Sequence, residues 1–65
     1  MKPHEERVVT EKTELDAKLE KLTTFIESAT FKDVPYGERF LLKRQKDVMQ
    51  QYSEVLKDRI DTFTA

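Results

Sequence analysis

The sequence predicts an all-α protein in which two helices form an antiparallel hairpin. Three observations lead to this fold class: residues of high helix propensity dominate, apolar residues recur at helical spacing, and proline and glycine occur in only two short stretches. The chain has 65 residues, which is enough for one small domain. Residues 1–65 are therefore expected to form a single helical-hairpin domain.

The first helix is expected over about residues 3–27. Pro3 suits a first helical position, because a residue there needs no N–H donor and already has a helical φ. Apolar residues then recur at intervals of seven, four, three and four, which places them along one helix face. This seam consists of Val8, Leu15, Leu19, Leu22 and Ile26.

The second helix is expected over about residues 35–63, after a connection at 28–34. Pro35 is expected to open this helix, and a connection so short favours antiparallel neighbours. Phe31 and Val34 are expected to fold back over the open end of the hairpin. The seam of the second helix consists of Leu42, Met49, Tyr52, Leu56, Ile60 and Phe63.

The second helix carries another apolar stripe beside its seam. Leu41, Val48 and Val55 recur at intervals of seven. One helical partner covers only a narrow seam, so this apolar face is wider than a lone hairpin requires. A chain this short buries little surface by itself. The hairpins are therefore expected to assemble into a homo-oligomeric helical bundle.

The composition excludes several kinds of site. The chain has no cysteine, which rules out disulfides and thiolate zinc sites, and its one histidine, His4, cannot form a His-rich metal site. A single glycine cannot build a glycine-rich phosphate loop. No nucleophile or carboxylate pair has the spacing of a catalytic site. We expect no enzyme activity, no metal and no cofactor.

The charge balance bears on possible partners. Twelve Lys and Arg residues oppose 13 Asp and Glu residues, and a net charge of −1 argues against nucleic-acid binding. No apolar run reaches the roughly 20 residues that span a bilayer, and no signal-peptide core is present at the start, so no membrane association is expected. One run, Arg39 to Lys46, contains four cations and no acid. It would suit a phosphate near the start of the second helix, or form a solvated face balanced by acids of the first helix.

Polar residues interrupt the apolar seams at three positions: Lys12, Gln45 and Arg59. Long cationic side chains can lie along apolar surface with the charge in water, and a polar seam residue can set register or oligomeric state. Alternatively, these residues line a pocket where protomers meet and hold an anion there. Arginine suits phosphate because its planar guanidinium donates two hydrogen bonds at once.

Most of the chain resembles a family of very short phage-encoded proteins described as small proteins related to a crAss-like phage product. In the first half, the resemblance is carried by the run from Pro3 to Leu19, PHEERVVTEKTELDAKL. In the second half it is carried by Phe31, Val34-Pro35, Leu41-Leu42, Arg44-Gln45, Met49, Tyr52-Ser53, Leu56 and Arg59-Ile60. The resemblance implies a phage accessory protein that acts in the host bacterial cytoplasm. Its design is similar to that of oligomeric helical sponges that oppose the CBASS and Thoeris defence systems.

By this analogy, the expected function is to bind and sequester a cyclic nucleotide or a cyclic ADP-ribose-type immune signal without cleaving it. The expected ligand contacts fall into three groups. Phosphates are assigned to Arg7, Lys12, Arg44 and Arg59, a base or ribose to Gln45, and an apolar wall to Tyr52.

Two alternatives remain open. The chain could be a protein-binding inhibitor or adaptor that presents the stripe of Leu41, Val48 and Val55 to a host protein. It could also be a structural helical oligomer without a ligand. In that case the charged seam residues would only weaken the packing.

Overall fold

The computed structural model describes residues 1–64 and contains two long helices joined by a compact connection. Helix α1 spans Pro3–Ile26 and helix α2 spans Tyr36–Asp61. Two short 3₁₀ helices, η1 at Ala29–Asp33 and η2 at Thr62–Thr64, follow them. No strand is present in this part of the chain, so the predicted all-α, two-helix fold is confirmed.

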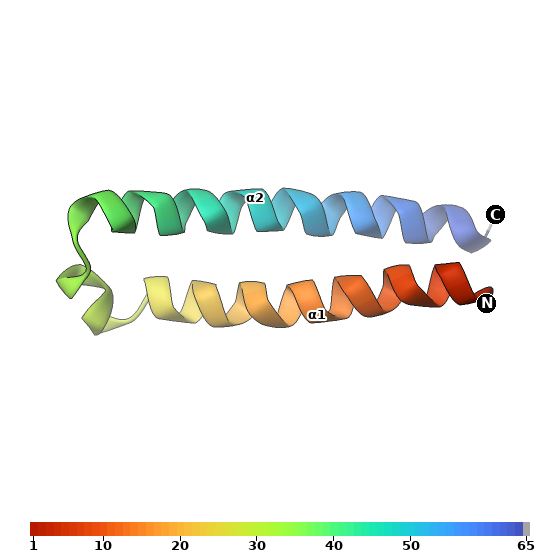
Figure 1. Ribbon diagram of the computed structural model, residues 1–65, viewed down its shortest axis with the longest axis horizontal. Coiled ribbons are helices and arrows are strands. Elements are labelled where there is room, and N and C mark those ends of the chain that lie inside the picture. Colours follow the sequence, from red (N-terminus) through yellow and green to blue (C-terminus); the bar gives the residue numbers. More distant parts are fainter. Residues whose placement is uncertain (65) are drawn as a thin grey trace.

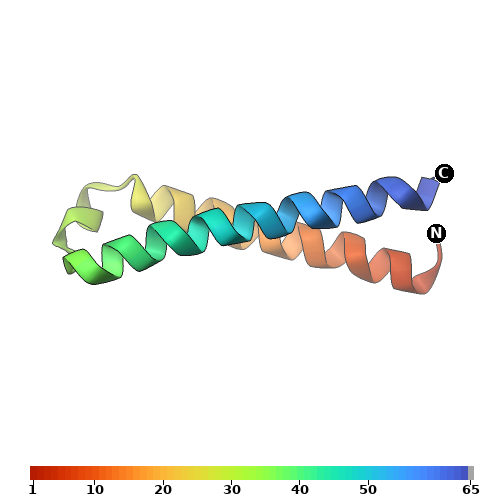
Figure 2. The same ribbon diagram turned by 90° about the horizontal axis from the view of Figure 1, so that it is seen from above.

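The two helices lie side by side and give the molecule the shape of a rod. Both chain ends lie at one end of the rod, and the connection between α1 and α2 lies at the other (Figure 1). Seen from above, the helices cross at a shallow angle (Figure 2). The rod measures 46 × 14 × 14 Å, so it is only two helices wide.

Helix α1 is stabilised at both ends by local polar groups. Pro3 occupies the first helical position, and the Glu5 carboxylate accepts a hydrogen bond of 2.9 Å from the Lys2 backbone N–H. Acidic residues in the first turn also interact favourably with the helix dipole. At the other end, the Ser28 hydroxyl donates to the Phe25 carbonyl at 2.6 Å, which satisfies one of the last carbonyls of the helix.

The boundaries of the connection differ from those predicted. Helix α1 ends one residue early, and five residues of the predicted connection form η1. Pro35 does not open α2 but precedes it as the N-cap, with an extended ψ of 143°. Its carbonyl still accepts the Arg39 N–H at 2.9 Å, so the helix starts at Tyr36. Helix α2 ends at Asp61, which leaves Phe63 in η2.

Phe31 closes the connected end of the hairpin. It is 7% exposed, and its ring meets that of Phe25 edge to face, with centroids 5.8 Å apart. The Lys43 ammonium lies 5.9 Å from the centroid of the Phe31 ring. Phe31 is therefore confirmed to fold back over the end of the hairpin where the connection lies, and Val34, three residues later, is half-buried.

The core of one hairpin is sparse. In the described chain, the buried apolar residues are Val8, Phe31 and Leu56, of which only Leu56 is fully buried. The remaining seam residues of α1 are only half-buried, as are Leu42, Met49 and Ile60 of α2. A single partner helix shields each seam from one side only. Leu56 is thus the best-packed side chain of a thin structure.

Replacing Leu56 with alanine should therefore destabilise the fold strongly. A fully buried leucine truncated to alanine loses about 2–5 kcal/mol, from lost burial and from the cavity left behind. Urea denaturation followed by circular dichroism measures the change. The control is Gln50→Ala, an exposed substitution on the same helix. Equal denaturation midpoints for the two variants would contradict the central role of Leu56.

Candidate functional site

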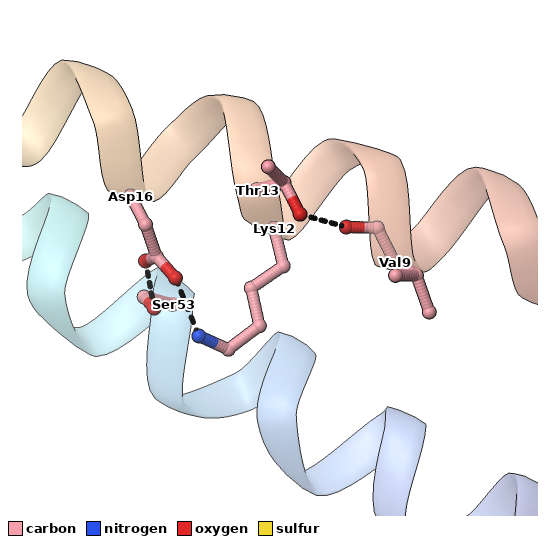
Figure 3. A network of polar contacts seen from close by, with 5 residues as sticks. All are labelled: Val9, Lys12, Thr13, Asp16 and Ser53. Atoms are coloured by element: carbon pink, nitrogen blue, oxygen red, sulfur yellow. Dashed lines mark hydrogen bonds and ion pairs between the residues drawn. The ribbon is translucent and has the colours of Figure 1, made fainter.

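Lys12, one of the predicted phosphate partners, belongs to a polar network between the helices (Figure 3). Its ammonium lies 2.6 Å from one carboxylate oxygen of Asp16, and the Ser53 hydroxyl donates to the other oxygen at 2.5 Å. Ser53 is buried, whereas the side chains of Lys12 and Asp16 are 26% and 43% exposed. The network therefore joins α1 to α2 at the edge of the seam.

The network favours the ionised form of Asp16. Hydrogen bonds from Lys12, and then from Ser53, lower the pKa of the Asp16 carboxyl below its ordinary value of 3.8. Because Asp16 holds the Lys12 ammonium, a phosphate would have to displace a carboxylate to bind there. Lys12 stays a predicted ligand residue, but its contacts in this structure are those of a helix-to-helix link.

The other predicted site residues are exposed. Gln45, Tyr52 and Arg59 follow one another at intervals of seven on α2, which places them on one face of that helix. Arg7 lies near the start of α1, and Arg59 lies in the last turn of α2. Arg44 is fifteen residues before Arg59, which corresponds to about 22 Å along a helix. One hairpin therefore does not bring Arg44 and Arg59 to the same phosphate.

The predicted α2 residues share their face with the second apolar stripe. Leu41, Val48 and Val55 are 58%, 55% and 54% exposed, and Tyr52 is 42% exposed. We call the combined surface the α2 stripe. Its members are Leu41, Arg44, Gln45, Val48, Tyr52, Val55 and Arg59. The stripe combines apolar side chains, one tyrosine ring and two guanidinium groups, a composition suited to a flat, anionic ligand or to a protein surface.

A second cationic feature surrounds the start of α2. A cleft of about 110 Å³ is lined by Tyr36, Arg39, Phe40 and Lys43. The Arg39 guanidinium lies 5.6 Å from the Tyr36 ring centroid, and its Nε is buried without a hydrogen-bond partner. The cationic run predicted Arg39 and Lys43 here, whereas the cleft itself and its wall of Phe40 were missed. The interleaving of aromatic and cationic residues over 36–43 is the signal that could have revealed them.

Two further features offer less for binding. A shallow depression of about 380 Å³ lies along α1 and is lined by Ala17, Glu20, Lys21 and Thr24. All four residues come from one helix, and an acid accompanies the only cation.

Among the described residues, no cluster of three His, Cys, Asp or Glu side chains could hold a metal ion. No described helix is long and apolar enough to cross a membrane.

The Asp16 network predicts a specific pH dependence of stability. A carboxyl whose pKa is lower in the folded state than in the unfolded state stabilises the fold above its unfolded pKa. That contribution is lost as the pH falls through the lowered folded pKa. Asp16→Asn should therefore reduce the free energy of unfolding at pH 7, by up to about 1 kcal/mol for a partly exposed pair. The difference from the wild type should shrink as the pH falls below about 4.

Urea denaturation of both proteins between neutral and acidic pH tests this dependence. The control is Glu14→Gln, an exposed carboxylate on the same helix. A stability difference for Asp16→Asn that stayed constant into the acid range would show that the carboxylate charge contributes nothing.

Comparison with known proteins gives one family match. A model of the family described as Sequestin matches residues 2–62, which is nearly the whole chain and includes both helices and every predicted site residue. No curated protein and no solved structure matches the chain. The extent of the family match shows that this chain belongs to the Sequestin family.

Proposed function

We propose that this protein is a phage anti-defence protein that sequesters a nucleotide immune signal in the host bacterial cytoplasm. The signal would be a cyclic nucleotide or a cyclic ADP-ribose-type molecule, bound without cleavage. The observation that carries the proposal is the Sequestin match over residues 2–62, because the family name denotes sequestration. The chemistry of the α2 stripe supports the choice of ligand class.

The α2 stripe offers the groups that such a ligand needs. Each arginine can donate a pair of hydrogen bonds to a phosphate. The exposed ring of Tyr52 offers a flat surface on which a base can stack, and Gln45 can both donate and accept hydrogen bonds. Within residues 1–64 of one hairpin, Arg44 forms no ion pair, so it need not leave an acidic partner to bind an anion.

Self-association is part of this proposal. Arg44 and Arg59 lie about 22 Å apart along one helix, farther than the phosphates of one small nucleotide span. Residues from different copies must therefore complete a site. The sparse core and the exposed apolar side chains of the α2 stripe also favour assembly, because each copy would bury further apolar surface.

A second function is favoured by the same exposed apolar face. Leu41, Val48 and Val55 could dock against a host protein, which would make the chain an inhibitor or adaptor without a small ligand. The two functions differ in what stays bound. A sponge retains a nucleotide and no stoichiometric host protein, whereas an adaptor retains a host protein and gives no response to nucleotides.

Nucleotide binding should raise the melting temperature of the protein. We suggest a thermal-shift screen with cyclic di-AMP, cyclic di-GMP, cyclic GMP-AMP and cyclic ADP-ribose. A ligand at 100 times its Kd should stabilise the fold by about 2.7 kcal/mol. Chromatography of the ligand released by heating should recover it intact. An unchanged melting temperature with every member of the panel would contradict the proposal.

The α2 stripe can be tested with a matched pair of substitutions. Arg44→Ala should weaken binding of the nucleotide that stabilises the wild type at least tenfold, since one charge-assisted contact contributes about 1.5–3 kcal/mol. Lys21→Ala, an exposed cation on α1, should leave the affinity unchanged. Isothermal titration calorimetry compares the two. Equal losses in both variants would show that only net charge matters.

A further inference from the structure

We infer that two copies of this chain pair through their α2 stripes in antiparallel orientation, with Val48 on the twofold axis. The inference rests on the proposed function, because the pairing joins Arg44 of one copy to Tyr52 of the other in a composite nucleotide site. The occupant of the exposed apolar face is thus a second copy of the chain. Register and charge along α2 select this arrangement.

Apolar register is the first reason. With Val48 facing its own counterpart, Leu41 of each copy lies level with Val55 of the other, so all three apolar positions of the stripe are paired. Each of these side chains is more than half exposed in the single hairpin. Shifting the antiparallel register by seven residues would leave one apolar residue of each copy unpaired. An isologous contact of this kind is how most soluble dimers form.

Charge is the second reason, and it excludes the parallel orientation. Two parallel helices in register would place Arg44 against Arg44 and Arg59 against Arg59, and like charges at an interface are repulsive. The antiparallel register centred between Gln51 and Tyr52 would place Arg44 against Arg59, which is also repulsive. Pairing centred on Val48 separates the four guanidinium groups of the two α2 stripes.

The selected register gives each arginine of the α2 stripe a suitable neighbour. Arg44 lies level with Tyr52 of the second copy, where a guanidinium can stack on the ring. Arg59 lies level with Gly37 of the second copy, beside the Glu38 carboxylate. Gly37 is exposed and has no side chain, and nothing lies within 4 Å of the position that a Cβ would occupy. The long side chain of Arg59 therefore has room to reach Glu38. In this pairing Arg59 joins the two copies, and Arg44 is the arginine of the α2 stripe that binds the ligand.

The pairing also explains how a site can form. The twofold axis generates two equal sites, each with a guanidinium from one copy and a phenol ring from the other. Gln45 follows Arg44 directly and lies at the edge of the same site. A ligand with a flat base and a phosphate could stack on the ring and bind the guanidinium together. A lone hairpin separates Arg44 from Tyr52 by two helical turns and offers no such pair.

Disulfide cross-linking tests the pairing without any ligand. The natural chain has no cysteine, so each introduced cysteine is the only one per copy. Val48→Cys should form a disulfide-linked dimer on mild oxidation, because residues on the axis meet their own counterparts. A mixture of Leu41→Cys and Val55→Cys should form the mixed dimer, seen by mass spectrometry. Leu41→Cys alone should not, since its counterpart lies about 21 Å away along the helix, and a disulfide needs Cα atoms within about 7 Å.

Gln50→Cys, which is exposed but outside the α2 stripe, is the control and should stay monomeric on oxidation. Cross-linking of Leu41→Cys to itself would overturn the antiparallel orientation. Light scattering measures the mass of the unmodified protein, so its result does not depend on whether a cysteine substitution disrupts the dimer. A mass of 7.7 kDa at micromolar concentration is that of a monomer and would overturn the pairing. The exposed apolar face would then be available to bind a different protein.

Complementation separates the composite site from the proposed function. With the nucleotide of the panel that stabilises the wild type as probe, Arg44→Ala and Tyr52→Ala should each lose binding. Mixed after unfolding and refolding together, they should regain about a quarter of the wild-type capacity, because half of the dimers are mixed and each has one intact site. No regain would overturn the composite site. If Val48→Cys forms the disulfide-linked dimer but no nucleotide of the panel binds, the pairing is supported and the proposed function is contradicted.

Discussion

The structure depends on how little a pair of helices can bury. Two rods in contact along one line shield each seam from a single side, so most seam residues remain half-exposed. Among the residues that the structure describes, Leu56 alone reaches complete burial. Neither a disulfide nor a wide core compensates. At the end of the hairpin where the connection lies, the buried Phe31 side chain covers the seam and shields it from water. The apolar face of α2 stays exposed for the same reason, because no second partner helix covers it.

Because so few apolar contacts are buried, polar side chains help to fix how α1 and α2 are aligned along their length. The bond between Ser53 and Asp16 joins residues 37 positions apart, and Lys12 holds the carboxylate from its own helix. Apolar side chains tolerate sliding, whereas a carboxylate with two directed donors does not. The seam is thus fixed along its length by a small polar group at its edge. This gives Lys12 a structural reason to interrupt the apolar pattern of α1.

The fold could be predicted because its signals are local. Helix propensity and the spacing of residues such as Val8 and Leu56 predict two helices, and Pro35 marks the second one to within a residue. The site is less accessible to such reasoning. Spacing placed Lys12 in the seam but could not reveal Asp16 as its partner, since that contact depends on side-chain conformation and on Ser53 across the interface. Phe40 was missed as a cleft wall because its role depends on where Arg39 lies.

The start of α1 and the end of α2 lie close together, which has a consequence for how the molecule could be rebuilt. The rings of His4 and Phe63 meet edge to face with centroids 6.3 Å apart, so the ends are neighbours (Figure 1). A few added residues could join them, and the chain could then be opened in the exposed backbone near Asp33. Such a circular permutant would keep every contact between α1 and α2 while reversing their order. The order of the helices in the gene is therefore not dictated by the packing.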